Sequence, residues 1–263
     1  MDTPPAGALD LIREEIDTID DAMLALLVRR FAAVEEGKRI KAASGAIAQS
    51  PIRPAREAAI LRRLVEAKPD SVPCELRVRL WRAIISASTL MQAPVRIHLG
   101  KGLFDSIGAR LMLRDHFGST PLAEHQGEAQ ALGALAGHPG DVAVVALDSA
   151  WLDPFLDGRA SQARVIATLP QVAGGAMPKM LVFGSASPEP TGDDETLLVT
   201  SGQLPRDFAP APLWQMRLGN RHLASLPGFL SETSQPLLGL MRSNVPLALM
   251  VLGRYPSPIE VRS

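Results

Sequence analysis

Seven polar side chains in the first 92 residues have the types needed to bind a small anion. They are Arg13, Arg30, Lys41, Arg56, Glu57, Ser88 and Gln92. The cations among them can clamp a multivalent anion and stabilise charge that develops on an oxygen. The set holds no histidine and no nucleophile beside a base, so neither covalent nor metal chemistry is expected. A unimolecular rearrangement needs only such a clamp, which also holds the substrate in a reactive conformer.

Two of these cations fall on an apolar helical stripe. The stripe runs through Ile12, Ile16, Ile19, Met23, Leu26 and Leu27, and its next steps are Arg30, Val34, Gly37 and Lys41. A solvated face would carry its cations opposite the stripe. A buried cation is costly unless an anion meets it. Either the helix leaves the core after Leu27, or Arg30 and Lys41 line a cavity that receives negative charge.

Three helices are predicted to position the seven residues. The first runs from about Leu9 to about Ala43, roughly 50 Å at 1.5 Å per residue. It is too long to be covered by the two shorter helices, so a second copy of the chain is its expected partner. The second helix starts at Pro54 and ends near residue 67. The third spans about residues 74–92 and carries Trp81, Ile85, Ser88 and Gln92 on one face.

The composition changes near residues 93–94, which predicts two domains, residues 1–93 and residues 94–263. In the second, short apolar runs alternate with Gly/Pro clusters, as in an α/β domain. Helices are expected at residues 104–117 and 127–135. Strands are expected at residues 95–99, 142–147, 164–169, 180–183, 197–200, 214–218 and 247–252.

Composition also limits the partners. The net charge is −1, so no basic excess indicates nucleic acid, and no apolar run has the length of a membrane span. Cys74 is the single cysteine, and the five histidines lack the spacing of metal ligands. We expect a soluble cytoplasmic protein without a bound metal.

The first third of the chain resembles the all-helical, type II class of chorismate mutase. The resemblance lies in LDLIREEIDTIDDAMLALLVRR (9–30), the spacing of eleven from Arg30 to Lys41, RPAREAAILRRL (53–64) and LWRAIISASTLMQ (80–92). It implies a three-helix fold in an intertwined homodimer and an isomerase that converts chorismate to prephenate without a cofactor. Arg13 would then bind a substrate carboxylate in the partner's site, and Arg30 the other carboxylate. Lys41 and Gln92 would hydrogen-bond the ether oxygen whose bond breaks.

The same resemblance assigns the remaining residues. Glu57 would accept a hydrogen bond from the substrate hydroxyl, while Arg56 and Ser88 would complete the wall. Many members carry an acidic residue before the second helix, where this chain has Arg53. Recognition of the hydroxyl would therefore rest on Glu57 and the backbone.

The second domain resembles a prephenate dehydratase domain in its opening, VRIHLGKGLFDSIGARLMLRDHFG, and in DVAVVALDS (141–149). The Thr-Arg-Phe triplet of that family has no match, since the nearest segment is Pro178-Lys179-Met180, and its Glu-Asn-Ser turn corresponds at best to Leu147-Asp148-Ser149. The domain is a degenerate relative or an unrelated α/β domain.

Three alternatives to a simple mutase stay open. The chain could be a non-catalytic sensor of an aromatic-pathway anion, a bifunctional mutase and dehydratase, or a dimerisation module for the second domain. Cations on the apolar stripe favour a site over a dimerisation module, because apolar residues there would give the more stable dimer.

Overall fold

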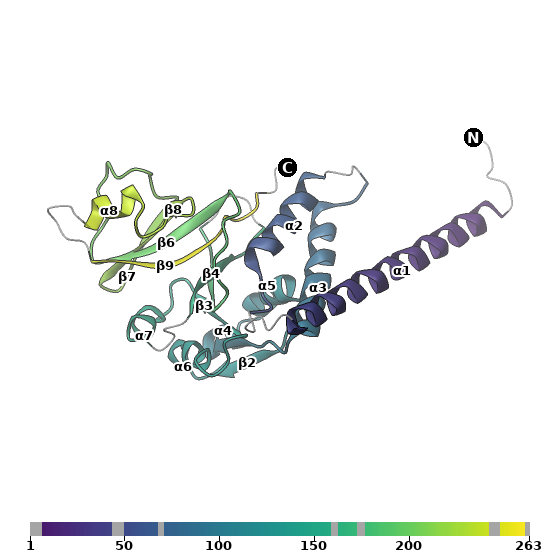
Figure 1. Ribbon diagram of the computed structural model, residues 1–263, viewed down its shortest axis with the longest axis horizontal. Coiled ribbons are helices and arrows are strands. Elements are labelled where there is room, and N and C mark those ends of the chain that lie inside the picture. Colours follow the sequence, from purple (N-terminus) through teal and green to yellow (C-terminus); the bar gives the residue numbers. More distant parts are fainter. Residues whose placement is uncertain are drawn as a thin grey trace. The chain divides into compact units, whose positions relative to one another are not determined.

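Three helices precede the first strand, strands then alternate with short helices as far as the fourth strand, and the remaining part is mostly strand (Figure 1). The computed structural model describes residues 7–43, 50–67, 71–158, 163–172, 177–241 and 248–260. The chain divides into two compact units, residues 1–48 and residues 49–263. The predicted fold class, a helical segment followed by an α/β part, is confirmed. The predicted domain boundary at residues 93–94 stays a prediction.

The first unit carries α1 (Ala8–Ala43), a helix of 36 residues. It confirms the first predicted helix. None of its side chains is buried, and Ile12, Ile16 and Ile19 are each about half exposed, at 51–52%. Isolated helices gain most of their stability from packing of an apolar face. The apolar stripe of α1 therefore requires a surface to pack against.

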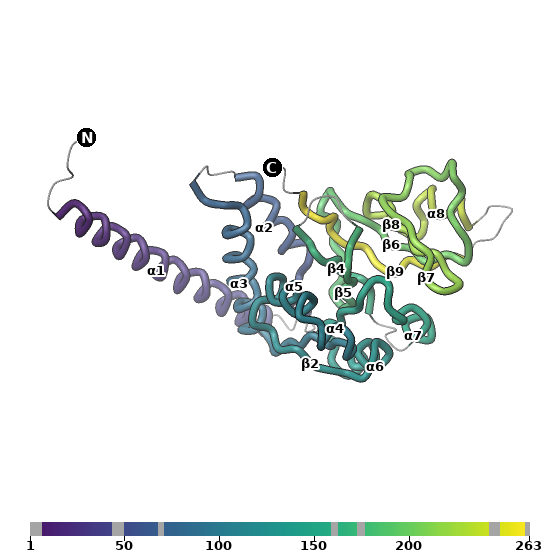
Figure 2. The backbone as a smooth tube through the Cα atoms, turned by 180° about the vertical axis from the view of Figure 1, so that it is seen from behind, coloured from purple at the N-terminus to yellow at the C-terminus, as the bar shows by residue number. Residues whose placement is uncertain are grey.

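The second unit begins with a helical hairpin of α2 (Pro54–Glu66) and α3 (Cys74–Gln92), shown in Figure 2. Pro54 occupies the first turn of α2, where its missing N–H costs nothing. Leu61 of α2 and Ile85 of α3 are buried. Both helices lie where the periodicity of the sequence predicts them.

A mixed sheet follows the hairpin. Its strands are β1 (Ile97–Gly100), β2 (Leu122–His125), β3 (Val142–Ala146), β4 (Arg164–Leu169), β5 (Met180–Gly184), β6 (Asp194–Thr200), β7 (Trp214–Leu218), β8 (Arg221–Pro227) and β9 (Leu249–Pro256). The strand order is β2-β1-β3-β5-β4-β9-β6-β8-β7. β1 pairs in parallel with β2 and β3, whereas β5 is antiparallel to both its neighbours.

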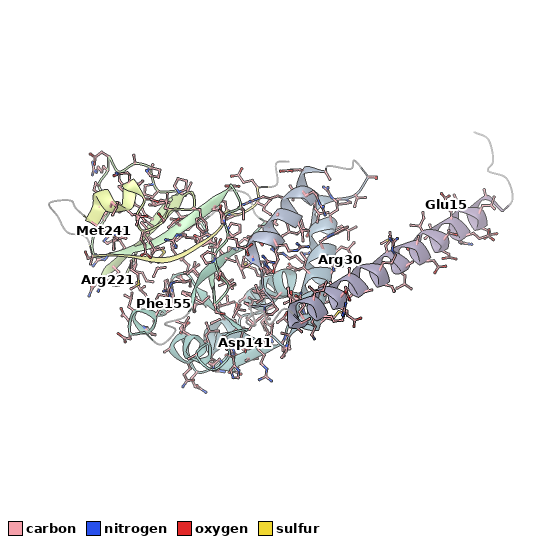
Figure 3. All side chains as sticks on the ribbon, viewed as in Figure 1. Glu15, Arg30, Asp141, Phe155, Arg221 and Met241 are labelled. Atoms are coloured by element: carbon pink, nitrogen blue, oxygen red, sulfur yellow. The ribbon has the colours of Figure 1, made fainter. Side chains whose placement is uncertain are left out.

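Short helices cover both faces of the sheet's first half. They are α4 (Lys101–Asp105), α5 (Ile107–Phe117), α6 (Glu128–Ala134) and α7 (Leu152–Leu156), while α8 (Gln235–Met241) packs on the second half. Leu113 of α5 shares one core with Leu99 of β1. Leu132 of α6 and Phe155 of α7, the latter labelled in Figure 3, share another with Val145 of β3. The order along the sheet and these two cores make the first half a three-layer α/β/α arrangement.

The two halves of the sheet meet at one close approach between strands. Gly253 of β9 pairs with Val165 of β4. A Cβ atom built on Gly253 would lie 2.0 Å from the carbonyl oxygen of Val165. Glycine is therefore required here to let the two backbones approach.

The predictions differ from the structure in several elements. The single helix expected at residues 104–117 is wrong, because Ser106 ends α4 and caps α5 by accepting from the Ala109 N–H. The strands β2 and β8 and the helices α7 and α8 were not predicted. β9 runs to Pro256, beyond the predicted 252. Residue 247, where that strand was expected to begin, lies outside the described residues.

Candidate active site

The long helix holds three of the seven predicted site residues. Arg30, labelled in Figure 3, and Lys41 are eleven residues apart, so they share a face of α1 and lie roughly 16 Å apart along its axis. Arg13 precedes Arg30 by 17 residues, or roughly 25 Å along the same axis. The Nη1 atom of Arg13 lies 2.9 Å from Oδ1 of Asp10, and both side chains are exposed. One α1 helix therefore cannot bring Arg13 and Arg30 onto the same small anion.

The helical hairpin holds the other four residues. Ser88 and Gln92 are one turn apart on α3. The Ser88 hydroxyl donates to the Ile84 carbonyl at 2.7 Å, and Gln92 Nε2 donates to the Ser88 carbonyl at 3.3 Å. Arg56 is exposed on α2. The structure thus brings Ser88 and Gln92 together on one helix face, as predicted.

Glu57 on α2 forms a buried ion pair with Arg82 on α3. Nη1 of Arg82 donates to Oε2 of Glu57 at 2.7 Å, and the two side chains are 3% and 15% exposed. Burial lowers the pKa of Arg82, and the nearby Glu57 carboxylate opposes that shift. Nη2 of Arg82 is buried without a hydrogen-bond partner in the described part of the chain. The pair fixes one carboxylate oxygen of a predicted site residue.

A small cavity of about 20 Å³ lies beside Glu57. Glu57, Ser86 and His116 contribute to its wall. Burial and the charge of Arg82 hold the pKa of His116 well below its usual range, so its imidazole is neutral near pH 7. A cavity of this volume can hold one water molecule where polar side chains such as these bond it.

Sequence reasoning missed Arg82. Its one signal in the sequence is that it is the single charged residue of LWRAIISASTLMQ (80–92). Arg30 and Lys41 were likewise singled out as cations among apolar residues. Its face of α3 differs from the predicted site face of Trp81, Ile85 and Ser88. The role of Arg82 depends on α5 packing against that face, and helical periodicity does not reveal such a contact.

A second polar cluster lies in the α/β part. His98 of β1 contacts Oδ2 of Asp141 through Nε2, at 2.9 Å, and His125 of β2 through Nδ1, also at 2.9 Å (Figure 3 labels Asp141). Burial lowers the pKa of His125, and His98 adds to the effect. Among the described residues, no group of His, Cys, Asp and Glu is arranged to hold a metal ion. The described helices also include none that is long and apolar enough to cross a membrane.

The two segments compared with dehydratase motifs lie side by side. The Leu147 N–H donates to the Lys179 carbonyl at 2.9 Å, and β3 pairs with β5 up to Ala146 and Met180. The Ser149 hydroxyl is turned back onto the Ala146 carbonyl at 3.0 Å. The segments therefore meet in space, although their residue types differ from those of the dehydratase motifs.

The chain thus consists of a helical segment that carries the predicted site residues and a mixed α/β part that follows it. The family model of chorismate mutase type II matches residues 12–93, and this segment is a type II chorismate mutase domain. The matched range includes all seven predicted site residues, from Arg13 to Gln92.

Two curated relatives carry the same kind of segment. The chain is 31% identical over 123 residues to the bifunctional chorismate mutase/prephenate dehydratase of Stutzerimonas stutzeri, covering 45% of this chain and 33% of that protein. For the bifunctional chorismate mutase/prephenate dehydratase of Pseudomonas aeruginosa the identity is 29%, over 44% of this chain and 33% of that protein. The chain thus matches about a third of the length of each relative. An alignment of 123 residues exceeds the helical segment, so the similarity continues into the α/β part.

Solved structures resemble the chain at lower identity. Prephenate dehydratase from Streptococcus mutans aligns with a TM-score of 0.38 and 14% identity over 62% of this chain and 97% of that one. A structure described as GqqA, a novel type of quorum quenching acylase, aligns with a TM-score of 0.42 and 13% identity, over 62% of this chain and 95% of that one. At these values the likeness concerns the fold alone.

Proposed function

We propose that the protein is a chorismate mutase, an isomerase that converts chorismate to prephenate in aromatic amino acid biosynthesis, on the phenylalanine and tyrosine branch of the shikimate pathway. The supporting observation is the family match over residues 12–93, which contains every position of the predicted site. The rearrangement is unimolecular, so binding, conformational restriction and electrostatic stabilisation suffice without a cofactor.

The catalytic residues in this proposal are Arg30, Lys41 and Gln92. Arg30 binds one substrate carboxylate through its guanidinium, which suits the planar carboxylate. Lys41 and Gln92 donate to the ether oxygen, where negative charge develops as the bond to carbon breaks. Donors aimed at that charge stabilise the transition state more than the ground state, and they therefore raise the rate.

Glu57, Arg56 and Ser88 recognise the rest of the substrate. Glu57 accepts from the substrate hydroxyl through Oε1, since Oε2 is held by Arg82. The residue that is often acidic in the family is Arg53 here, and its Nη2 pairs with Oε1 of Glu189 at 2.6 Å. Arg53 is thus engaged with the α/β part, which leaves Glu57 as the carboxylate for the hydroxyl.

The enzyme acts as a homodimer with shared sites in this proposal. Arg13 and Arg30 lie roughly 25 Å apart along α1, so Arg13 can complete a site only in another copy of the chain. The half-exposed stripe of Ile12, Ile16 and Ile19 is the surface for that contact. We further expect a cytoplasmic enzyme without nucleic-acid or membrane partners.

The decisive experiment follows the absorbance of chorismate with purified full-length protein, alone and with Phe, Tyr or Trp. We expect enzyme-dependent loss of chorismate and formation of prephenate, and no such loss with Lys41→Ala. Binding of chorismate without conversion would contradict the mutase proposal and leave the alternative of a non-catalytic sensor. Chorismate that neither binds nor reacts would exclude both.

A prephenate dehydratase activity is the second candidate, because the relatives' similarity reaches the α/β part and residues 147–149 lie beside residues 178–180. Dehydration needs an acid for the departing hydroxyl and a cation for the carboxylates. Pro178 can supply neither, although Lys179 is a cation. We therefore expect no phenylpyruvate, measured in alkali, after incubation with prephenate near neutral pH. Enzyme-dependent phenylpyruvate would make the protein bifunctional.

A further inference from the structure

Arg82 is the most deeply buried cation beside the proposed mutase site and has no part in the function described so far. Its side chain is 3% exposed, and its one ion-pair partner in the described part of the chain is Glu57. Nη1 donates to Oε2 of Glu57, while Nη2 is buried and has no acceptor among the residues that the structure describes. Among the described residues, no hydrogen bond reaches the other oxygen of Glu57, Oε1.

This arrangement is poor for stability. Withdrawing a guanidinium from water costs several kcal/mol, and a single hydrogen bond to one carboxylate offsets only part of it. Two apolar side chains of similar volume would serve the packing of α2 on α3 at least as well. A costly ion pair of this kind is expected where the position of one of its members matters for function.

The α/β part encloses Arg82 from the other side. His116 of α5 adds no charge next to the Arg82–Glu57 pair, because its imidazole is neutral beside the guanidinium. The Ser86 hydroxyl of α3 donates to the carbonyl of Phe117 at the end of α5, at 2.5 Å, which fixes the two helices one turn from Arg82. Arg82 and His116 line a common cavity between α3 and α5 of about 610 Å³. The surroundings of Arg82 are therefore made by the hairpin and by α5 together.

We propose that Arg82 is a positioning residue of the mutase site, which holds Oε2 of Glu57 so that Oε1 meets the substrate hydroxyl, and that α5 supports Arg82 in this role. The α/β part then has a function in the mutase reaction without binding the substrate. The inference rests on the proposed mutase activity.

The test compares two buried arginines of α3. Arg77 is 9% exposed and donates through Nη1 to the Leu64 carbonyl, so it also fastens α3 to α2, and its Nε has no partner within the described ranges. It does not touch Glu57. Arg82→Met, Arg77→Met, Glu57→Gln and the double variant Arg82→Met/Glu57→Gln are assayed for kcat/KM on chorismate and for thermal unfolding. Arg82→Lys tests rescue by a cation, and Arg82→Gln replaces Arg82→Met if that variant does not fold.

We expect Arg82→Met to lower kcat/KM at least about tenfold, since a slight misplacement of a contact group costs this much or more. The double variant should be no slower than Glu57→Gln alone, because both changes remove one contact. Arg82→Lys should recover part of the loss. Arg77→Met should lower the melting temperature while kcat/KM stays within about twofold, as a change outside the site does.

Different failures have different meanings. The positioning role would be overturned if the losses of kcat/KM in Arg82→Met and Glu57→Gln multiply in the double variant. It would also be overturned if Arg82→Met has a kcat/KM no lower than that of Arg77→Met. Either result would leave the proposed mutase activity intact. An active wild type unaffected by Glu57→Gln would do the same. A wild type that leaves chorismate unchanged would overturn the mutase and, with it, this inference.

Discussion

The α1 helix and the α2–α3 hairpin belong to one mutase segment, yet their side chains lie in opposite environments. Not one side chain of α1 is buried, and its apolar stripe carries the exposed Ile12, Ile16 and Ile19. The hairpin instead buries polar side chains, including Arg77, Arg82 and Ser86, against the rest of its own unit. The apolar surface of α1 is exposed, while two of the arginines of α3 are enclosed.

This difference shows that the hairpin and α1 are stabilised in different ways. The hairpin is held within the chain, through Ile85 and Leu61 and through hydrogen bonds from α3 to α2 and α5. The helix α1 depends on a surface that packs on its stripe, because isolated helices are marginal in water. Substitutions on the apolar stripe of α1 should therefore act through assembly, whereas substitutions of the hairpin's core residues Leu61 and Ile85 should act through the stability of the folded chain.

The largest effect is expected from Lys41→Ala on α1 and Gln92→Ala on α3. Each removes a proposed donor to the breaking ether bond, which typically costs on the order of 10²–10³ in kcat. The helical content measured by circular dichroism should be unchanged in both. A variant that keeps near wild-type turnover would remove that residue from the site.

Complementation in mixed dimers tests whether α1 acts across the dimer. Arg13→Ala and Arg30→Ala should each be inactive as homodimers. After unfolding and reassembly together, a heterodimer should regain one intact site, because Arg30 of one chain and Arg13 of the other are both present. Activity is measured on heterodimers purified with two different tags. An inactive, verified heterodimer would place Arg13 outside the site of the other chain.

The sequence predicts the three helices because their signals are local. Ile12 to Leu27 repeat at helical spacing, and Pro54 marks a first turn. The cations Arg30 and Lys41 were recognisable because they continue an apolar stripe. The strands β1, β3 and β5 are short buried apolar runs, so the local sequence predicts them as well.

The contacts that join distant elements were not predictable. Glu57 pairs with Arg82 only because α3 lies between α2 and α5, and no spacing in the sequence encodes that arrangement. The break between α4 and α5 depends on the side chain of Ser106 capping α5. The order of nine strands depends on pairings such as that of Val165 with Gly253, which are 88 residues apart in the numbering. Local pattern therefore gives the elements and the candidate residues, and long-range packing decides which of them meet.

Gly118→Ala should destabilise the hairpin's junction with α5. Gly118 has φ of +56°, and a Cβ there would lie 2.8 Å from Cβ of Ser86 on α3. Strain and the clash together should lower the free energy of unfolding by about 1–3 kcal/mol. Gly108→Ala, at the other end of α5, is the control, since no atom lies within 4 Å of its added Cβ. Chemical denaturation of both variants measures the difference, and equal stabilities would show that α3 and α5 are less tightly packed than described.

The smallest effect is a pH dependence of stability that comes from His116. Its folded-state pKa lies well below the usual histidine value of 6.5, chiefly through burial and secondly through the charge of Arg82. As the pH falls below about 6.5, the unfolded chain binds this proton before the folded one, so stability is lost with acidification. One such group contributes a slope of up to about 1.4 kcal/mol per pH unit.

His116→Asn should flatten the stability profile between pH 7 and pH 5, measured by denaturation at a series of pH values. His125→Asn, whose pKa is also lowered but whose ring is less enclosed, should flatten it less. A His116→Asn stability profile parallel to that of the wild type would mean that the imidazole is solvated. In that case α5 would not enclose Arg82, and the contrast between the exposed α1 and the enclosed hairpin would be weaker than described.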